Sequence, residues 1–172
     1  IDSFYLNQFT RRYMLHILSR MTYYVEQSCG INSSFVTYVN RQQKNPYDIE
    51  HIWADDYTQG NHLNEFLTEE EFKTFRNRFG GLLILPKDKN RSYQDMEYSK
   101  KVTKYDSENL LARTLNDNCY SNNPSFLRFM QDKNLLFKPY ADFNKLDLIE
   151  RQKLYKEICK NLHSDSNHSF VA

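Results

Sequence analysis

The segments 47-YDIEHIWAD-55 and 80-GGLLILP-86 decide the fold that this sequence predicts. Both are short and rich in aliphatic or aromatic residues, which favours extended strands. The first is unusual because the adjacent residues Glu50 and His51 interrupt it beside Ile52. Such a pair is either a satisfied structural contact or the start of an active site, and most isolated histidines in apolar surroundings are structural. The rest of the chain has to decide between the two readings.

Length and composition indicate one globular domain. The chain has 172 residues, of which 40% are hydrophobic, with 13 Tyr and 12 Phe. Its three cysteines are widely spaced and form no C-x-x-C pair, which argues against a zinc ribbon and favours a reduced, cytoplasmic protein. No membrane-spanning run or signal peptide is visible. Because the sequence starts at Ile1, we expect it to be the C-terminal part of a longer protein.

The charges are unevenly distributed, although the net charge is only +1. Eight acidic and no basic residues lie between Asp48 and Glu71, whereas nine basic and three acidic residues lie between Lys73 and Lys104, a net charge of +6. A phosphate-binding surface explains the basic stretch. The alternative is a helix with acids at its start and bases at its end, and this accounts only for Glu69 to Arg78.

Helices are expected on both sides of the strands. Apolar residues at three- and four-residue steps predict a long first helix, and Thr68 with Glu71 forms a capping box for another. Asn144 is expected to cap the last helix, and Pro124 suits a first helical turn. The stripe of the first helix comprises Leu6, Phe9, Tyr13, Ile17, Met21 and Tyr24. The expected helices cover residues 4–29, 34–42, 68–79, 90–105, 107–115, 124–131 and 145–162, and we expect the polar tail 163–172 to be frayed.

Three pieces of the central block form a recognisable pattern: 50-EHI-52, then 80-GGLLILP-86, then 87-KDKNRS-92. The pattern resembles an HNH nuclease, in which a ββα unit holds one divalent metal against a phosphodiester. It is most similar to the HNH domain at the C-terminal end of GmrSD-like, modification-dependent restriction enzymes. The resemblance implies a mostly helical α+β domain over residues 1–172. Its ββα-metal core would span about 47–105, with helical flanks at 4–45 and 106–162.

The resemblance also implies roles for particular residues. Glu50 and Asn90 would be ligands of Mg²⁺ or Mn²⁺, and His51 would be the general base, with Asn90 completing the catalytic site. Hard cations prefer such oxygen ligands, and a histidine titrates near neutral pH. Lys101 and Tyr105 correspond to a later Lys and Tyr of the family. The expected nucleic-acid contacts are Lys87, Lys89, Arg91, Lys101 and Tyr105.

One position departs from the family pattern. The central Asn of related enzymes lies nine positions before the helix Asn, and that position is Gly81 here. This Asn normally orients the histidine, so Asn77 or a backbone carbonyl is expected to replace it. Adjacent strand residues also face opposite sides, so Glu50 and His51 share a site only if the strand ends or twists there.

Each residue also has a structural reading. Glu50 could be a salt-bridge partner and Asn90 a helix cap, while Lys101 and Tyr105 could pack within a helix rather than contact phosphate. His62 is expected to be a polar loop residue.

The resulting functional expectation is a metal-dependent DNA endonuclease in bacterial restriction or anti-phage defence. Its partners would be DNA and an upstream regulatory domain, without a membrane. The alternative, motivated by Gly81, is an HNH-derived module that binds nucleic acid with weak or no catalysis. A helical interaction domain with a fortuitous motif is a third possibility.

Overall fold

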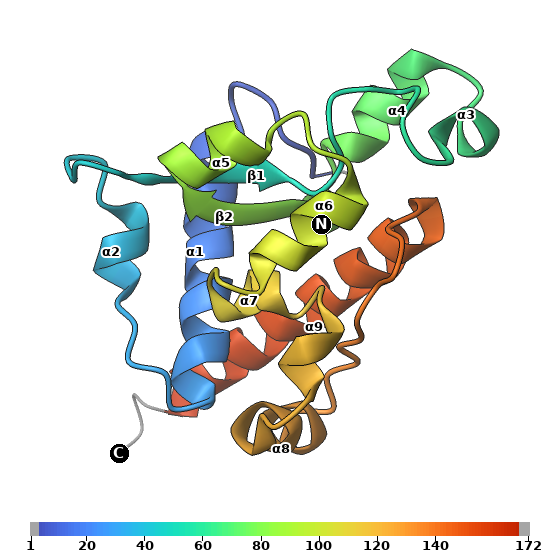
Figure 1. Cartoon of the computed structure of the whole chain (residues 1–172). Helices are drawn as coiled ribbons and strands as arrows, with labels where there is room; N and C mark the ends of the chain where they lie inside the picture. The colour runs from blue at the N-terminus through green and yellow to red at the C-terminus, as the bar shows by residue number, and fades with distance from the viewer. Residues whose placement is uncertain (1–3, 169–172) are drawn as a thin grey trace.

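The computed structural model describes residues 4–168 and consists of many helices around one small sheet (Figure 1). Strands β1 (Tyr47–His51) and β2 (Leu82–Pro86) pair antiparallel, with Tyr47 opposite Pro86 and His51 opposite Leu82. The helices are α1 (Arg11–Ser28), α2 (Phe35–Val39), α3 (His62–Glu65), α4 (Glu69–Arg76), α5 (Lys87–Tyr93), α6 (Tyr98–Tyr105), α7 (Leu110–Arg113), α8 (Pro124–Asp132) and α9 (Lys145–His168), with 3₁₀ turns η1 (Phe79–Gly81) and η2 (Asp117–Tyr120). This is the mostly helical α+β fold that the sequence predicts.

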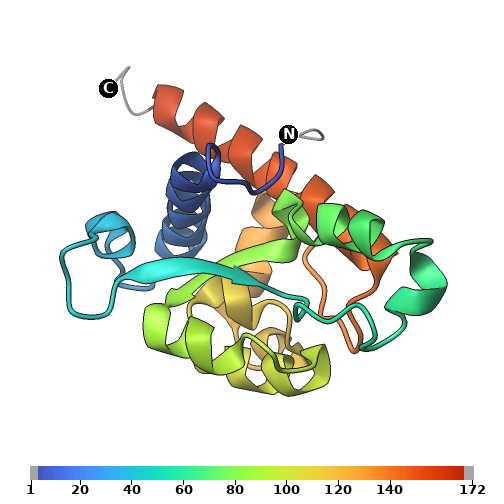
Figure 2. The same cartoon turned by 90° about the horizontal axis from the view of Figure 1, so that it is seen from above.

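The sheet is covered on both faces. Seen from above, α1 and α9 lie on one side of the two strands, and α5 and α6 lie on the other (Figure 2). The first four residues of β2 are all buried, which explains why 82-LLILP-86 is a continuous apolar run rather than an alternating one. No helix within residues 4–168 has the length and apolarity needed to cross a membrane.

Several predicted helix starts are confirmed. Thr68 accepts a hydrogen bond from the Glu71 amide at 3.1 Å, and the Glu71 carboxylate accepts one from the Leu67 amide. Pro124 occupies the first turn of α8. Asn144 accepts from the amide of Asp147 at 3.1 Å, while the Asp147 carboxylate accepts from the Asn144 amide at 3.0 Å.

The first helix was predicted wrongly at its start and in its buried face. Residues before Arg11 form a turn, because the Asn7 side chain accepts hydrogen bonds from the amides of Phe9 and Thr10 and so competes with helix formation. The Leu6 amide instead donates to the Asn77 carbonyl at 2.7 Å. The buried apolar stripe is therefore rotated relative to the predicted one: Phe9 is 77% exposed, and the fully buried apolar residues of α1 are Met14, Leu18, Met21 and Val25, of which only Met21 was predicted.

Other boundaries also differ from the prediction. The second helix is only five residues long. The segment expected to be one helix from Asn90 to Tyr105 is two, because the chain leaves helical geometry between Gln94 and Glu97. The fifth predicted helix is reduced to Leu110–Arg113, capped by Asn109. The last helix continues to His168, so the part of the predicted tail that the structure describes is helical.

Turn η1 makes the closest contact with the C-terminal helix. A Cβ placed on Gly80 would lie 2.4 Å from the Leu148 carbonyl oxygen and 2.7 Å from the Gln152 amide nitrogen. These atoms belong to the α9 backbone, so no rotamer change can relieve the overlap. Glycine is therefore needed at position 80 for α9 to pack against the entry to β2.

We expect Gly80→Ala to destabilise the protein by about 3 kcal/mol, the upper end of typical overpacking costs, because the clash is with backbone. Gly30→Ala is the matched control. A Cβ there would meet no atom within 4 Å, and the φ of +75° alone would cost about 1 kcal/mol. Denaturant unfolding of both variants measures the difference. Equal losses of stability would show that the packing of η1 on α9 is not tight.

Candidate active site at the end of strand β1

Glu50 is held by two side chains from helix α6. Its carboxylate is buried, with 1% of the residue exposed. Atom Oε1 accepts hydrogen bonds from Lys101 Nζ at 2.8 Å and from the Tyr105 hydroxyl at 3.0 Å. Lys101 Nζ also donates to the backbone carbonyl of His51 at 2.7 Å. One ammonium group therefore fixes both the acid and the end of the strand that carries it.

Burial is the largest influence on each of these groups. It raises the pKa of Glu50, and the Lys101 ammonium and Tyr105 hydroxyl oppose that increase. Burial likewise lowers the pKa of Lys101, against the attraction of Glu50. The pKa of Tyr105 is raised, first by burial and then by the Glu50 charge, so its hydroxyl stays a donor. Each charge depends on its partner to remain ionised at this depth.

The predicted nucleic-acid contacts at Lys101 and Tyr105 disagree with this geometry. Both residues are 0% exposed, and both polar atoms are directed at Glu50. Neither side chain reaches a surface at which a phosphate could bind. The alternative reading, that they pack within the domain, matches what the structure shows, and their role is to hold Glu50.

His51 lies beside Glu50 in the chain, but its side chain has a different partner. Its Nε2 atom lies 2.9 Å from Asn77 Oδ1, at the C-terminal end of α4. The Asn77 amide nitrogen donates to the Lys73 carbonyl at 2.9 Å, so the amide oxygen faces the imidazole. The proton of neutral His51 is therefore on Nε2, and Nδ1 keeps its lone pair.

Gly81 cannot supply this contact, and the structure shows why a larger residue is disfavoured there. A Cβ at Gly81 would lie 3.1 Å from both the Arg76 carbonyl oxygen and Leu148 Cδ1. The Gly81 carbonyl accepts from the Ile52 amide at 2.9 Å, which continues the strand pairing past His51. The side chain that meets the imidazole comes from Asn77, which the sequence had suggested as one of two substitutes.

Arg76 is a site residue that the sequence analysis missed. Its Nε atom donates to the carbonyls of Trp53 and Ala54, at 3.1 and 3.0 Å. Its charge also acts on His51. Burial first, and then the positive charge of Arg76, lower the pKa of His51 to about 3, so the imidazole is neutral at pH 7. The only feature of the sequence that could have indicated Arg76 was its position next to Asn77. The spacing of residues along the chain did not indicate its hydrogen bonds to the carbonyls of Trp53 and Ala54.

Asn90 lies on α5, the helix that follows β2. Its amide nitrogen donates to the Ile49 carbonyl of β1 at 2.7 Å, which leaves Oδ1 as the available atom. The same helix carries Lys87, Lys89 and Arg91, of which Lys89 and Arg91 are exposed and Lys87 is partly buried. None of the three forms an ion pair within residues 4–168. Helix α5 thus brings an amide oxygen and a basic surface to the strand that carries Glu50 and His51.

Comparison with known proteins identifies the family of this chain. The family model for the C-terminal domain of GmrSD restriction endonucleases matches residues 2–158. The chain belongs to this family. No curated protein and no solved structure matches the chain. Membership of the GmrSD C-terminal domain family indicates a nuclease of the restriction-endonuclease type. The match includes α6 and most of α9 as well as the ββα core, so the flanking helices are part of the GmrSD C-terminal domain.

We expect Lys101→Met to destabilise the domain by about 3–5 kcal/mol, because it leaves the Glu50 carboxylate buried without its counter-charge. Lys100→Met is the matched control. Lys100 is exposed, its nearest acid is Glu97 at 3.9 Å, and its replacement should cost less than about 1 kcal/mol. Denaturant unfolding compares the two.

The double variant Glu50→Leu with Lys101→Met tests the cause of that destabilisation. Removing both charges should recover most of the stability that the single variant loses, because no unpaired charge is left. A double variant as unstable as the single one would show that Lys101 contributes mainly by packing.

Proposed function

We propose that this chain is a metal-dependent DNA endonuclease of the HNH type, acting in bacterial restriction or anti-phage defence. The observation that carries the proposal is the hydrogen bond between His51 Nε2 and Asn77 Oδ1, which leaves Nδ1 of a neutral imidazole as a base. In this reaction Nδ1 takes a proton from the water that attacks the phosphorus, the bond from phosphorus to the leaving oxygen breaks, and that oxygen takes a proton from solvent. Asn77 holds the ring and accepts from its Nε2–H throughout the transfer.

Arg76 has a second effect in the proposed reaction. Its positive charge disfavours a protonated His51 in the free protein. A phosphodiester bound nearby would offset that charge, so the imidazole becomes a better base once substrate is present. The proton would then reside on His51 until solvent removes it.

The residues fit a divalent cation in two respects. The hydrogen bonds from Lys101, at 2.8 Å, and Tyr105, at 3.0 Å, both go to Glu50 Oε1, which leaves Oε2 as the carboxylate oxygen for a cation. Asn90 presents its amide oxygen, because its nitrogen is bonded to Ile49. Glu50 and Asn90 would hold the cation, and Lys101 would share Glu50 with it. When bound, Mg²⁺ or Mn²⁺ would neutralise charge on the scissile phosphate.

Water and phosphate oxygens would have to complete the coordination. No group of three or more His, Cys, Asp or Glu side chains within the described part of the chain is placed to hold a metal ion. A site with few protein ligands is expected to bind the cation weakly without DNA.

The alternative function is an HNH-derived module that binds DNA without cutting it. Gly81 motivates this reading, because the histidine would then lack its orienting Asn. The contact between Asn77 and His51 favours the nuclease, since an equivalent acceptor is present. The upstream domain, the cytoplasmic location and the role in defence remain part of the proposal.

We expect His51→Ala to lower the rate of plasmid nicking by a factor of about a hundred or more, because the general base is removed. DNA binding and the unfolding midpoint should change little, since His51 is at the strand end. His163→Ala, an exposed residue near the end of α9, is the matched control and should nick normally. An unchanged rate in His51→Ala would remove His51 from the mechanism.

Metal dependence gives a separate expectation. Nicking should stop in EDTA and return with Mg²⁺ or Mn²⁺, and Asn90→Ala should weaken Mn²⁺ binding measured by electron paramagnetic resonance. Glu50→Ala combined with Lys101→Met, so that no buried charge is left unpaired, should do the same. Asn45→Ala is the control for Asn90, because Asn45 bonds to Asp88 at the other end of α5. Full activity in chelator would contradict the metal-dependent mechanism.

The basic surface of α5 should bind phosphate. Neutralising Lys89 or Arg91 should lower the slope of log affinity against log salt by about 0.9 on duplex DNA, for each phosphate that the variant no longer binds. Binding measured at several salt concentrations tests this. Lys153→Ala on α9 is the control. An unaltered slope for both α5 variants would mean that the surface is only solvated.

A further inference from the structure

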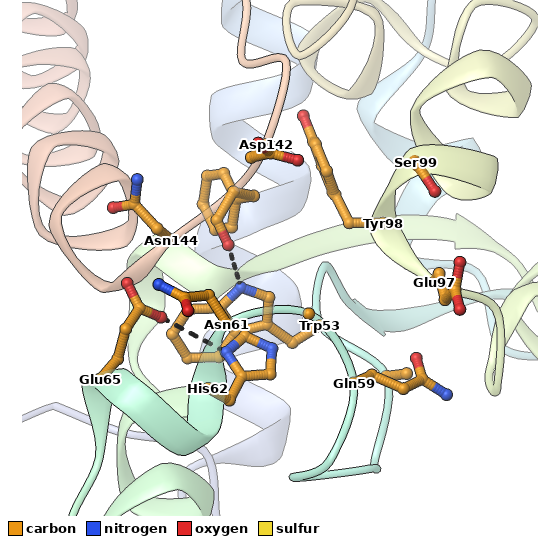
Figure 3. Close-up of a pocket in the computed structure, with 13 residues that line it drawn as sticks. Trp53, Gln59, Asn61, His62, Glu65, Glu97, Tyr98, Ser99, Asp142 and Asn144 are labelled. Carbon is orange, nitrogen blue, oxygen red and sulfur yellow. Dashed lines mark hydrogen bonds and ion pairs between the residues drawn. The ribbon is translucent and has the colours of Figure 1, made fainter.

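A second candidate site lies in a pocket of about 480 Å³ beside Trp53. The wall comes from three parts of the chain: the segment that includes α3, the start of α6 and the residues just before α9 (Figure 3). Trp53 lies at its base, where its Nε1 atom donates to the Phe143 carbonyl. The volume suits a small organic molecule.

The charge of the lining is negative. Glu65, Glu97 and Asp142 all border the pocket, and no Lys or Arg does. Glu97 and Asp142 are exposed at the rim, whereas Glu65 is partly buried. A phosphate or another anion would therefore be repelled, which separates this pocket from the proposed DNA surface on α5.

Buried polar atoms without a good hydrogen bond gather at the same place. Gln59 Oε1, His62 Nδ1 and Glu65 Oε2 are buried and lack a hydrogen bond, and they are three of six such atoms within the described residues. His62 Nδ1 and Glu65 Oε2 lie 3.5 Å apart, which is too long for a good hydrogen bond. Because His62 Nδ1 faces a carboxylate, it carries the proton of the neutral ring, so the atoms that lack a well-placed donor are the oxygens of Gln59 and Glu65.

His62 was predicted to be a polar loop residue, and that prediction is wrong. It is 8% exposed, and its ring centroid lies 4.6 Å from that of Trp53. Burial lowers the pKa of His62, so the ring is neutral and adds no positive charge to the pocket.

The spacing of the acids argues against a metal ion. No three acidic or histidine side chains in the described part of the chain converge closely enough to hold one. In Figure 3, Glu65 and Glu97 lie at opposite sides of the pocket, and Asp142 lies above Trp53. A stacked nucleobase is also disfavoured, because Trp53 is only 2% exposed and offers no free face. The ligand that matches has several N–H donors spread over its length.

We propose that this pocket binds an organic cation with ammonium or guanidinium groups at spaced positions, such as a linear polyamine. Its N–H groups would bond to Glu65, Glu97 and Asp142, and to the unpartnered Gln59 oxygen. The bound cation would join α3 to the start of α6, the helix that carries Lys101. This site is independent of the nuclease chemistry and does not require it.

Trp53 provides the measurement, because it is the one tryptophan in the sequence. Spermidine titrated into the intact chain without DNA should change Trp53 fluorescence saturably and raise the melting temperature. Arginine methyl ester forms the second arm. Tighter binding of spermidine indicates a free polyamine ligand, and tighter binding of the ester indicates a side chain from another protein. Mg²⁺ at matched ionic strength should not reproduce either response.

Matched variants locate the binding. Glu97→Gln and Asp142→Asn are surface changes that should leave the fold intact and weaken spermidine binding by about tenfold each, since each removes a charge-assisted hydrogen bond. Asp132→Asn, an exposed acid at the end of α8, should bind normally. His62→Gln should also weaken binding.

Three outcomes would overturn the proposal. The first is no saturable response up to millimolar ligand, which would mean that water alone occupies the pocket. The second is equal weakening by Asp132→Asn, which would mean diffuse attraction to acidic surface. The third is an unchanged affinity in both Glu97→Gln and Asp142→Asn.

Discussion

The burial of one carboxylate constrains the rest of the site. Glu50 is almost completely removed from water, and a charge at that depth is tolerated only with a partner. Lys101 and Tyr105 supply that partner from positions four apart on α6, and therefore from one face of the helix. The direction of α6 relative to β1 follows from this requirement. Because the same ammonium bonds to the His51 carbonyl, it also fixes where the strand ends.

The side chains of the adjacent residues Glu50 and His51 thus point in two different directions. Glu50 turns toward α6 and is neutralised there, whereas His51 turns toward α4 and meets Asn77. The expected difficulty, that neighbouring strand residues face opposite sides, is real in this structure. Lys101 connects the two residues, because its ammonium group bonds to the Glu50 carboxylate and to the backbone carbonyl of His51 rather than to the imidazole. The acid and the base can therefore act on one phosphodiester only if the substrate spans the end of β1.

The sequence predicted the fold class, the two strands and the caps at Thr68, Pro124 and Asn144, because these depend on local patterns. It misplaced the start of the first helix, since Asn7 and the contact between Leu6 and Asn77 override the periodicity. It also treated residues 90–105 as one segment, although the break before Tyr98 is what turns Lys101 inward.

At the site, the motif proposed Glu50, His51 and Asn90 as functional residues, but it did not predict the environment of each residue. Whether Lys101 would contact phosphate or a buried acid depends on the helix direction, which no local pattern encodes. Arg76 was missed for a related reason. Its hydrogen bonds go to backbone carbonyls, which leave no trace in side-chain spacing, and its ion pair with Asp55, at 3.6 Å, is set by tertiary packing. Asn77 could only be suggested as one of two substitutes, since its distance to His51 is set by tertiary packing.

The close packing of Gly80 against α9 bears on whether the ββα motif could fold outside this domain. The Tyr155 hydroxyl on α9 donates a hydrogen bond to the Leu82 carbonyl. In the segment before α9, the Phe143 carbonyl accepts one from Trp53. Polar groups at the entry to β2 and just beyond β1 are thus satisfied by residues more than fifty positions later in the chain. A ββα fragment excised on its own would expose these groups and the apolar faces around them. The family model, which matches residues 2–158, likewise includes the motif together with most of these helices.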